Sequence, residues 1–332
     1  MDRPKKVLVT GATGFLGGRV AHRLVELGYE VRALVRKQSV MNSLKNLGVE
    51  IVLGDLADQS SVAAAVDGVE LVVHAGAGTS GTAEDSDKAT IQGTLNVLAG
   101  CRKHRVQKLV HISSCNVYET AGLAEGQVVT EEAQLERFPQ RRGRYTAAKL
   151  RAEALVIEAM KAGALPAVVL RPGTLYGPGA ETYTPMMGVS LAGRLFIVFG
   201  NGSSALPLVH VDNVVDAITG CLGNSAADNQ VFNVVDHGTI TKRRYVEMLV
   251  KPLHPSASVI YLPMPLLLCL TWLEEKLLTA LGRRPPLTVY RLLSSQSQVR
   301  YGTSRIEAAI GWRSRVSFEQ GTGQLLRTHE RA

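Results

Sequence analysis

The segment from Lys6 to Gly18 constrains the fold of this chain more than any other stretch. It reads KVLVTGATGFLGG, so a β-branched apolar run is followed by glycines at three-residue spacing, at Gly11, Gly14 and Gly17. A helical pattern of apolar residues then runs to Gly28, which is placed to end the helix. We therefore predict a strand, a tight turn and a helix in direct succession.

This pattern suits a nucleotide site. Glycines let the backbone approach a pyrophosphate, which the N–H groups and the positive dipole end of the next helix can hold without a charged side chain. The spacing differs from the simplest Gly-x-Gly-x-x-Gly fingerprint, and glycines also mark bulges and turns. Its position between a buried strand and an amphipathic helix nevertheless favours nucleotide binding. The expected cofactor contacts in this turn are Gly11, Thr13, Gly14, Phe15, Leu16 and Gly17.

Strand and helix patterns continue to alternate along the chain. Apolar strand patterns at 30–35, 50–53, 70–74 and 108–112 are separated by helical patterns. Such alternation predicts a parallel sheet with helices on both faces, which is an α/β, Rossmann-type doubly wound fold. The 332 residues also allow a smaller C-terminal substrate lobe. We assign residues 1–180 to an NAD(P)-binding domain to which 205–240 return, 181–204 and 241–325 to the substrate lobe, and 326–332 to a tail.

The end of the second predicted strand bears on which dinucleotide is bound. An NAD site has a carboxylate there for the ribose hydroxyls, whereas the 2′-phosphate of NADP calls for Arg or Lys. Val35 stands where the acid would be expected, and Arg36 and Lys37 follow. These two residues also suit an ordinary solvated loop. We expect NADP to be preferred, with NAD as the alternative, and Arg36 to contact the phosphate.

Two further strand ends carry residues suited to the cofactor. Gly54-Asp55-Leu56 follows the third strand, where Asp55 can meet the adenine amino group or cap the next helix. Ala75-Gly76-Ala77 follows the fourth strand, where small residues let the sugar–phosphate spine lie close to the backbone. We interpret His74 as a hydrogen-bonded core histidine rather than a ligand or a base.

The loop after the fourth strand is expected at the substrate mouth. Loops beyond the carboxyl ends of parallel strands line the crevice of an open α/β sheet. Residues 78–88 are rich in Gly, Ser, Thr and Asp. We therefore assign Gly78 and Thr79 to substrate binding.

The residues that carry chemistry follow the fifth strand. That strand ends in Ser113-Ser114, and Tyr145 and Lys149 share a face of a later helix at i, i+4 spacing. A nearby ammonium lowers the pKa of a phenol, so Tyr145 can exchange a proton with a substrate hydroxyl while Ser114 hydrogen-bonds the same oxygen. Lys149 can also hold the nicotinamide ribose. A Tyr-x-x-x-Lys pair alone is more often a pair of solvated side chains. Together with the Ser113-Ser114 strand end and the glycine-rich first turn, it predicts a hydride-transfer site.

At these positions the chain resembles the extended branch of the short-chain dehydrogenase/reductase superfamily. This branch includes nucleotide-sugar epimerases and dehydratases, 3β-hydroxysteroid dehydrogenases and dihydroflavonol reductases. The resemblance implies a Ser114, Tyr145 and Lys149 triad, and cofactor contacts from Pro172 and Thr174. The matching segments are TGATGFLG at 10–17, GDL at 54–56, ISSCNVY at 112–118, YTAAK at 145–149, LRPGTLYGPG at 170–179, LVHVDN at 208–213 and VFNV at 231–234.

Some positions depart from the patterns of particular members. Thr90 stands where many members have Asn, which weakens any transfer of active-site hydrogen bonds. Sugar 4,6-dehydratases follow the catalytic hydroxyl with Asp-Glu, whereas Cys115 and Asn116 stand here, which disfavours dehydration. We assign Asn116 and Tyr183 to substrate binding.

The resulting functional prediction is an NAD(P)-dependent oxidoreductase that acts between a secondary alcohol and a ketone. A nucleotide-sugar epimerase with the same triad and a retained NAD is the alternative, and a non-catalytic nucleotide-sensing protein of the same fold is a second one.

The charge distribution limits the partners. The net charge of +8 lies in residues 241–332, which hold 14 Lys/Arg and 6 Asp/Glu. These basic residues are scattered among apolar ones without an aromatic stacking platform, so we expect no nucleic-acid partner. An anionic substrate, a solvated face or, less favoured, an acidic membrane surface are the readings left open. We expect a small-molecule substrate, which is a ketone, an alcohol or a nucleotide sugar, and a homodimer.

The cysteines and the N-terminus suggest a cytoplasmic protein. The four cysteines lie far apart without a Cys-x-x-Cys pair, so we predict reduced buried thiols and neither a metal site nor a disulfide framework. Met1 to Lys6 runs directly into the first strand, so no signal peptide is expected.

One apolar segment, residues 259–281, has several interpretations. It contains Pro263 and Pro265 and is too short to span a bilayer. A core helix of the substrate lobe is the simplest interpretation, and a substrate wall or an interfacial surface are the others. Arg283 and Arg284 follow it, where they can meet anionic headgroups or a substrate phosphate.

Overall fold

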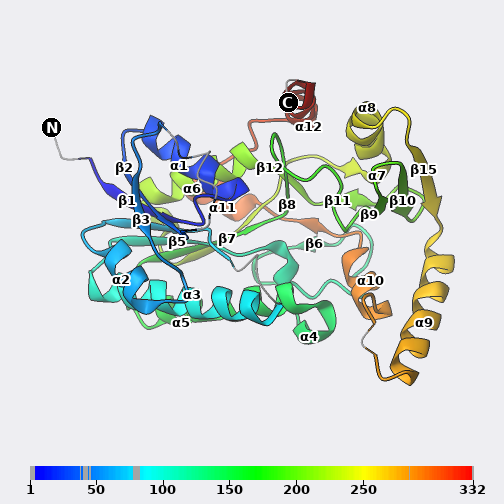
Figure 1. Ribbon diagram of the computed structural model, residues 1–332, viewed down its shortest axis with the longest axis horizontal. Coiled ribbons are helices and arrows are strands. Elements are labelled where there is room, and N and C mark those ends of the chain that lie inside the picture. The colour runs from blue at the N-terminus through cyan, green and yellow to red at the C-terminus, as the bar shows by residue number, and fades with distance from the viewer. Residues whose placement is uncertain are drawn as a thin grey trace.

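A seven-stranded parallel sheet forms the centre of the larger half, in the order β13-β7-β5-β4-β1-β2-β3 (Figure 1). The computed structural model describes residues 4–37, 39, 44, 46–77, 83–283 and 285–330, without the side chains of residues 83–88. The seven strands are β1 (Lys6–Thr10), β2 (Glu30–Val35), β3 (Glu50–Leu53), β4 (Leu71–His74), β5 (Lys108–Ile112), β7 (Ala167–Pro172) and β13 (Gln230–Val234).

Helices cover both faces of this sheet. On one face pack α1 (Phe15–Glu26), α6 (Val211–Gly223) and α11 (Ser304–Ile310). On the other face pack α2 (Gln59–Val66), α3 (Ala83–Lys103) and α5 (Arg144–Lys161) (Figure 1). The predicted doubly wound α/β class is confirmed.

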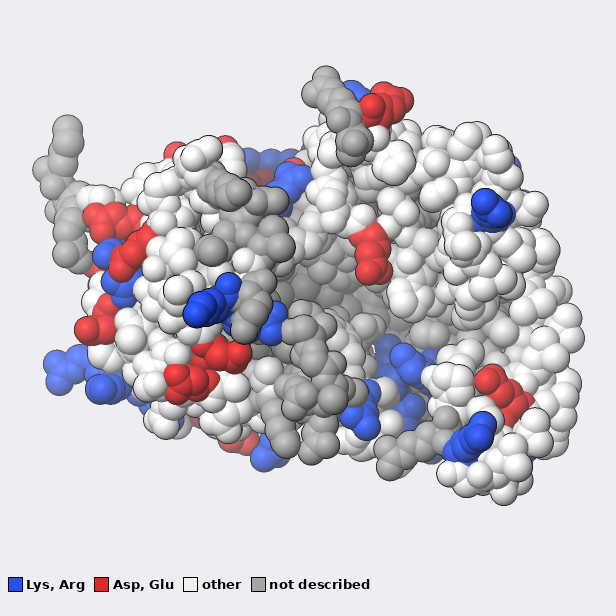
Figure 2. Space-filling view, viewed as in Figure 1, with Lys and Arg blue, Asp and Glu red and all other residues white. Residues whose placement is uncertain are grey.

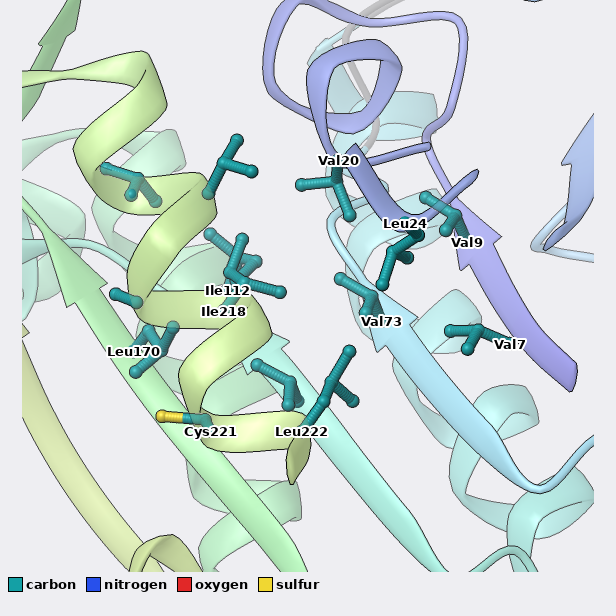
Figure 3. Close-up of a cluster of buried hydrophobic side chains, with 14 of the residues drawn as sticks. Val7, Val9, Val20, Leu24, Val73, Ile112, Leu170, Ile218, Cys221 and Leu222 are labelled. Atoms are coloured by element: carbon teal, nitrogen blue, oxygen red, sulfur yellow. The ribbon is translucent and has the colours of Figure 1, made fainter. Parts of the chain in front are cut away.

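The alternation of side chains along each strand explains why both faces are covered. Val7 and Val9 of β1 pack with α1 and α6, whereas Leu8 between them packs with the helices of the opposite face. Val20 and Leu24 of α1 lie at i, i+4, and Figure 3 shows them above the strands. All five side chains are completely buried, so this sequence pattern fixes the position of α1 on the sheet.

The boundaries of the sheet elements agree closely with the sequence patterns. The strands predicted at 30–35, 50–53 and 108–112 have these bounds, and β4 begins one residue later than predicted, at Leu71. The predicted end of the first helix is also confirmed, because α1 stops at Glu26 and Gly28 adopts a φ of 81°.

The smaller half contains a three-stranded sheet, β15-β10-β9. β9 (Gly188–Leu191) is antiparallel to β10 (Leu195–Phe199), and β10 is parallel to β15 (Ser258–Leu262). The inner face of this sheet packs against a helical run of α7 (Lys242–Tyr245), a π-helical turn at Val246–Val250 and α8 (Lys251–Leu253). Residues 242–253 are thus helical, with a π-helical middle.

The other elements are short, apart from α9 and α12. Because α12 continues to Glu330, residues 326–330 are helical and do not form the expected tail. These elements are β6 (Val128–Val129), β8 (Thr174–Tyr176), β11 (Ala205–Leu206), β12 (Leu208–His210), β14 (Ile240–Thr241), β16 (Arg300–Tyr301), α4 (Pro139–Arg142), α9 (Met264–Ala280), α10 (Val289–Ser295) and α12 (Phe318–Glu330), with 3-10 turns at Cys115–Val117 and Ser225–Ala227.

The apolar segment at 259–281 does not form a core helix. In α9 only Leu267 and Thr271 are buried, and most of its other leucines are exposed. That interpretation is wrong because an apolar run looks the same in sequence whether or not a neighbour covers its outer side. Cys269 lies on this helix and is exposed, so the prediction of buried thiols holds only for the other three cysteines. No helix in the described part of the chain is long and apolar enough to cross a membrane.

Candidate active site

The glycine-rich turn between β1 and α1 has little room for side chains. Gly11 adopts a φ of 73° and accepts a 2.9 Å hydrogen bond from Gly14 N–H. A Cβ on Gly17 would lie 2.1 Å from the Gly11 carbonyl oxygen, and a Cβ on Gly11 would lie 2.8 Å from Cα of Gly76. The turn therefore packs tightly against the end of β4, at the point where the strand order reverses.

The start of α1 is suited to an anion. Gly14 is the N-cap residue and provides no side-chain cap, and the first turn contains no acidic residue. Backbone N–H groups at an uncapped helix start need acceptors, and a pyrophosphate supplies them. Thr13, Phe15 and Leu16 are half-buried around the start of α1. These features fit the phosphates of a dinucleotide.

The other predicted cofactor residues follow neighbouring strands on the same edge of the sheet. Val35 ends β2 and is buried, whereas Arg36 after it is exposed. Asp55 and Leu56 follow β3, residues 75–77 follow β4, and Pro172 and Thr174 lie at the end of β7 and in β8. The carboxyl ends of these parallel strands lie at one edge of the sheet. The structure therefore brings these residues to the same side of the crevice.

Asp55 does not cap the helix after it. Asp58 is the N-cap of α2, where its carboxylate accepts hydrogen bonds from the backbone N–H groups of Ser60 and Ser61. Asp55 accepts a 2.8 Å hydrogen bond from Ala57 N–H and so shapes its own turn. The capping prediction is wrong because two aspartates near a helix start satisfy the same sequence pattern.

The end of β5 and the start of α5 bring the three predicted catalytic side chains together. Lys149 Nζ donates a 2.9 Å hydrogen bond to the carbonyl of Ile112, the last residue of β5. Ser114 Oγ accepts a 3.2 Å hydrogen bond from Asn116 N–H, and the Ser114 side chain lies close enough to the Tyr145 hydroxyl to lower its pKa. Since the Ser114 oxygen already accepts an N–H, its hydroxyl proton is free to point toward the oxygen of Tyr145.

The adjacent residues Ser113 and Ser114 have different neighbours. Ser113 is buried, and its Oγ donates a 2.5 Å hydrogen bond to Glu153 Oε2. Ser114 lies on the opposite side of the backbone and faces Tyr145. Ser113 is therefore committed to the protein interior, while Ser114 faces the crevice.

The pKa values differ from the simple expectation of an activated phenolate. The Tyr145 ring is 55% exposed to the crevice, yet its pKa is raised because the protein desolvates its hydroxyl end, and the Ser114 hydrogen bond offsets only part of this. Burial lowers the pKa of Lys149 to about 8, against a smaller opposing effect of Glu153. The expected lowering of the phenol pKa by the ammonium is not among the causes of this shift, and Lys149 Nζ hydrogen-bonds the Ile112 carbonyl. At neutral pH Tyr145 is a protonated phenol.

A buried ionic network holds α5, the helix that carries Tyr145 and Lys149. Arg171 Nη2 donates a 2.5 Å hydrogen bond to Glu153 Oε1, and both side chains are almost fully buried. Arg171 Nη1 also donates to Tyr118 Oη at 2.6 Å, and this hydroxyl donates to Asn233 Oδ1 at 2.6 Å. Glu153 lies one turn after Lys149 on α5, so the network fixes the helix that carries the catalytic residues.

The sequence matches a known family over most of its length. Residues 7–234 match the pattern described as the NAD dependent epimerase/dehydratase family. The chain belongs to this family. It is a nicotinamide-dependent enzyme, an oxidoreductase or an epimerase, of the extended short-chain dehydrogenase type, as the sequence motifs predicted.

Two relatives of this family member are reductases of ketones by name. The chain is 28% identical over 326 residues to 4-hydroxy-2-methyl-3-oxo-4-farnesyl-3,4-dihydroquinoline-1-oxide ketoreductase of Stigmatella aurantiaca, covering 96% of this chain and 95% of the relative. It is 38% identical over 212 residues to 2-alkyl-3-oxoalkanoate reductase of Stenotrophomonas maltophilia, covering 63% of this chain and 62% of the relative.

Solved structures share the fold of this family member. The crystal structure of gox2253 superposes with a TM-score of 0.80 at 24% identity and covers 99% of both chains. UDP-glucose 4-epimerase of Thermotoga maritima superposes with a TM-score of 0.76 at 20% identity, covering 98% of this chain and 99% of that one. These likenesses confirm the Rossmann-type fold.

His74 has the structural role predicted for it. Its Nδ1 lies 2.7 Å from Thr10 Oγ1 and its Nε2 lies 3.0 Å from Thr94 Oγ1. Burial, with a smaller effect of the Lys149 charge, lowers its pKa to about 3, so the imidazole is neutral. His74 therefore joins β1, β4 and α3 beneath the crevice.

The sequence analysis did not identify the arginines that lie beside α5, the helix that carries Tyr145. A Cβ on Gly143, the N-cap of α5, would lie 3.7 Å from Cζ of Arg291, so this guanidinium adjoins the start of the helix that carries Tyr145. Arg141 stacks 4.6 Å from the centre of the Tyr290 ring. Figure 2 shows basic side chains gathered in the hollow between the two halves, near the place of α4 and α10 in Figure 1. No sequence signal links α4 to α10, because they are far apart in the chain.

The predicted substrate residues have different surroundings. Asn116 is half-buried in the 3-10 turn after Ser114. Tyr183 is also half-buried, and its hydroxyl donates a 2.9 Å hydrogen bond to the Ile197 carbonyl, which is a structural contact. Gly78 and Thr79 lie outside the described residues. Substrate binding by these residues stays a prediction.

Proposed function

We propose that this protein is an NAD(P)-dependent oxidoreductase that interconverts a ketone and a secondary alcohol through Ser114, Tyr145 and Lys149. The observation that carries the proposal is the closeness of the Ser114 and Tyr145 side chains at the end of β5, where Lys149 is anchored. Two hydroxyl groups that face a crevice together can hold one substrate oxygen between them.

The protonation states favour ketone reduction at neutral pH. Tyr145 is a neutral phenol with a raised pKa, so it can donate a proton to the oxygen of a ketone as that oxygen gains negative charge. Ser114 donates a second hydrogen bond to the same oxygen. The nicotinamide cofactor, when bound, supplies the hydride for the carbonyl carbon. The products are then a secondary alcohol and a Tyr145 phenolate, which takes up a proton from solvent, while Lys149 would hold the nicotinamide ribose.

We propose NADP as the preferred cofactor, with NAD as the alternative. The uncapped start of α1 and the turn from Gly11 to Gly17 would hold the pyrophosphate. Val35 offers no carboxylate for a ribose hydroxyl, and the exposed Arg36 after it is placed to meet a 2′-phosphate. Residues 1–180 and 205–240 would form the cofactor-binding part, and 181–204 and 241–325 the substrate-binding part.

The reductase relatives support a ketone substrate. One relative that matches nearly the whole chain is a ketoreductase by name, and the other is named a 2-alkyl-3-oxoalkanoate reductase. A cytoplasmic location and a homodimer stay predictions.

The test is a spectrophotometric assay of NADPH and NADH oxidation with 2-alkyl-3-oxoalkanoates and a panel of other ketones. We expect turnover with at least one ketone, and a loss of about 100-fold or more in Tyr145→Phe, since general acid catalysis contributes about that much. Cofactor affinity, measured by fluorescence titration, should stay close to wild type. Tyr29→Phe is the matched control and should keep full turnover.

Two results would contradict the proposal. One is a Tyr145→Phe variant that keeps most of its rate on a substrate of the wild type. The other is a protein that purifies with tightly held NAD, converts nucleotide sugars and never changes the net amount of NADH or NADPH, which is the behaviour of an epimerase.

A further inference from the structure

The outer side of α9 is apolar. Leu266, Leu270, Leu273 and Leu277 recur at helical spacing as one stripe along α9, and each is between 48% and 62% exposed. In a helix on the surface of a soluble domain this side is normally polar. Among the described residues of the chain, nothing covers these leucines.

The neighbouring sheet extends the same apolar surface. Val189, Ile197 and Ile260 lie side by side across β9, β10 and β15. They point away from the buried inner face that contains Phe196, and Val189 and Ile260 are about half exposed. The three-stranded sheet of β9, β10 and β15 is therefore apolar on both faces.

The sheet and the helix form one continuous surface. Phe199 and Leu262, on the outer face of the sheet, pack with Leu267 on the inner side of α9. Figure 1 places β15 and α9 end to end along one edge of the molecule, and Figure 2 shows mostly uncharged residues along that edge. We name this surface the apolar edge; its exposed members are Val189, Leu191, Ile260, Leu266, Leu270, Trp272, Leu273, Leu277 and Leu281.

Basic residues surround the apolar edge. Residues 240–300 contain nine Lys/Arg and three Asp/Glu, and thus hold most of the net charge of +8. Lys276 lies on the exposed part of α9, and Arg283 follows the helix. Exposed Arg194 and Lys251 belong to the β9–β10 turn and to α8. Of the three acids, Glu247 and Glu274 are exposed, whereas Glu275 is half-buried and accepts a 2.9 Å hydrogen bond from Val289 N–H.

We propose that the apolar edge binds the surface of an anionic lipid bilayer, with α9 lying in the interface. A helix with an exposed leucine stripe and cationic neighbours suits this position, because the leucines enter the acyl region while the cations meet headgroups. A second copy of the chain would bring like charges together around the edge, whereas anionic headgroups neutralise them. The charge therefore selects the bilayer over self-association.

Vesicle sedimentation tests the proposal with the full-length protein. The vesicles are phosphatidylcholine alone, and equal parts of phosphatidylcholine and phosphatidylglycerol. We expect binding at least about tenfold tighter to the anionic vesicles, weakened by salt. Changing Leu270, Leu273 and Leu277 together to Ser should reduce binding by at least about tenfold. Lys276→Gln with Arg283→Gln should remove the preference for anionic vesicles.

The controls separate binding from folding. Leu27, at the end of α1, is 46% exposed, so Leu27→Ser should bind vesicles like the wild type. The melting temperature of the triple Ser variant should stay near that of the wild type because its changed side chains are exposed. Leu267→Ser should lower it, since Leu267 is buried.

Three results would overturn the proposal. The first is a wild type that binds neither kind of vesicle. The second is a triple Ser variant that is folded and binds as well as the wild type. The third is a dimer, seen by sedimentation velocity without lipid, that the triple substitution dissociates while vesicle binding is unchanged; the apolar edge would then be a contact between two copies of the chain.

Discussion

Removing the negative charge of Glu153 should destabilise the protein strongly. In Glu153→Gln the shape is nearly kept, but the buried Arg171 loses the carboxylate that accepts its hydrogen bonds at 2.5 Å and 3.1 Å. Arg171 is 3% exposed, so water cannot replace the lost acceptor. Breaking a buried pair on one side costs about 3–5 kcal/mol. Ser113 can accept from the new amide, and the main-chain carbonyl of Glu131 still accepts from Arg171, so we expect the lower end of this range.

Urea unfolding followed by circular dichroism at neutral pH measures this loss. The matched control is Glu158→Gln on the same helix, because Glu158 is exposed and its change should stay within about 0.5 kcal/mol. A second comparison replaces both partners, Glu153 by Leu and Arg171 by Met. This double variant should be more stable than Glu153→Gln, since no unpaired charge remains buried. A loss below about 1 kcal/mol in Glu153→Gln would refute the reasoning.

Three further predictions concern the crevice. Replacing Arg36 by Ala should weaken NADP binding more than NAD binding in titration calorimetry, because a charge-assisted contact to the 2′-phosphate is lost; equal affinities of the wild type for both would contradict this. Gly17→Ala should destabilise the protein by roughly 1–3 kcal/mol and weaken cofactor binding, since its methyl would lie 2.1 Å from the Gly11 oxygen. Gly223→Ala, where the methyl meets no neighbouring atom within 4 Å, is the control in thermal unfolding. The folded-state pKa of Lys149, about 8, is depressed below its ordinary 10.5, so the wild type should gain up to about 3 kcal/mol of stability relative to Lys149→Met as pH rises from 8 to 10.5. A stability difference that does not change over this range would show that Lys149 is not desolvated.

Local pattern was enough to predict the sheet and the shared helix of Tyr145 and Lys149. The strand ends follow directly from where apolar runs meet charged residues or glycine, as at Val35 and Leu53. Tyr145 and Lys149 share a helix, so their relation is written in the spacing of the chain. Site features that depend on one short segment are therefore accessible from sequence.

Features that depend on packing between distant segments were not accessible. The closeness of Arg291 to Gly143 arises because α10 folds back against α4, and no pattern marks this. The exposure of Leu270 and Cys269 depends on what lies outside α9, which the sequence of the helix does not contain. The protonated state of Tyr145 likewise depends on how the surrounding chain desolvates its hydroxyl.

The last strand of the central sheet limits how this protein can be divided. β13 and α6 come after the chain has already built β9 and β10 of the other half, and they then return to complete the central sheet (Figure 1). A fragment that ends at residue 180 would leave the edge of β7 unpaired and would expose the strand face that Val214, Ile218 and Leu222 cover. The half that contains the central sheet is therefore not a separable module. Exchange of substrate lobes between relatives has to be designed with at least two junctions, on either side of the returning segment.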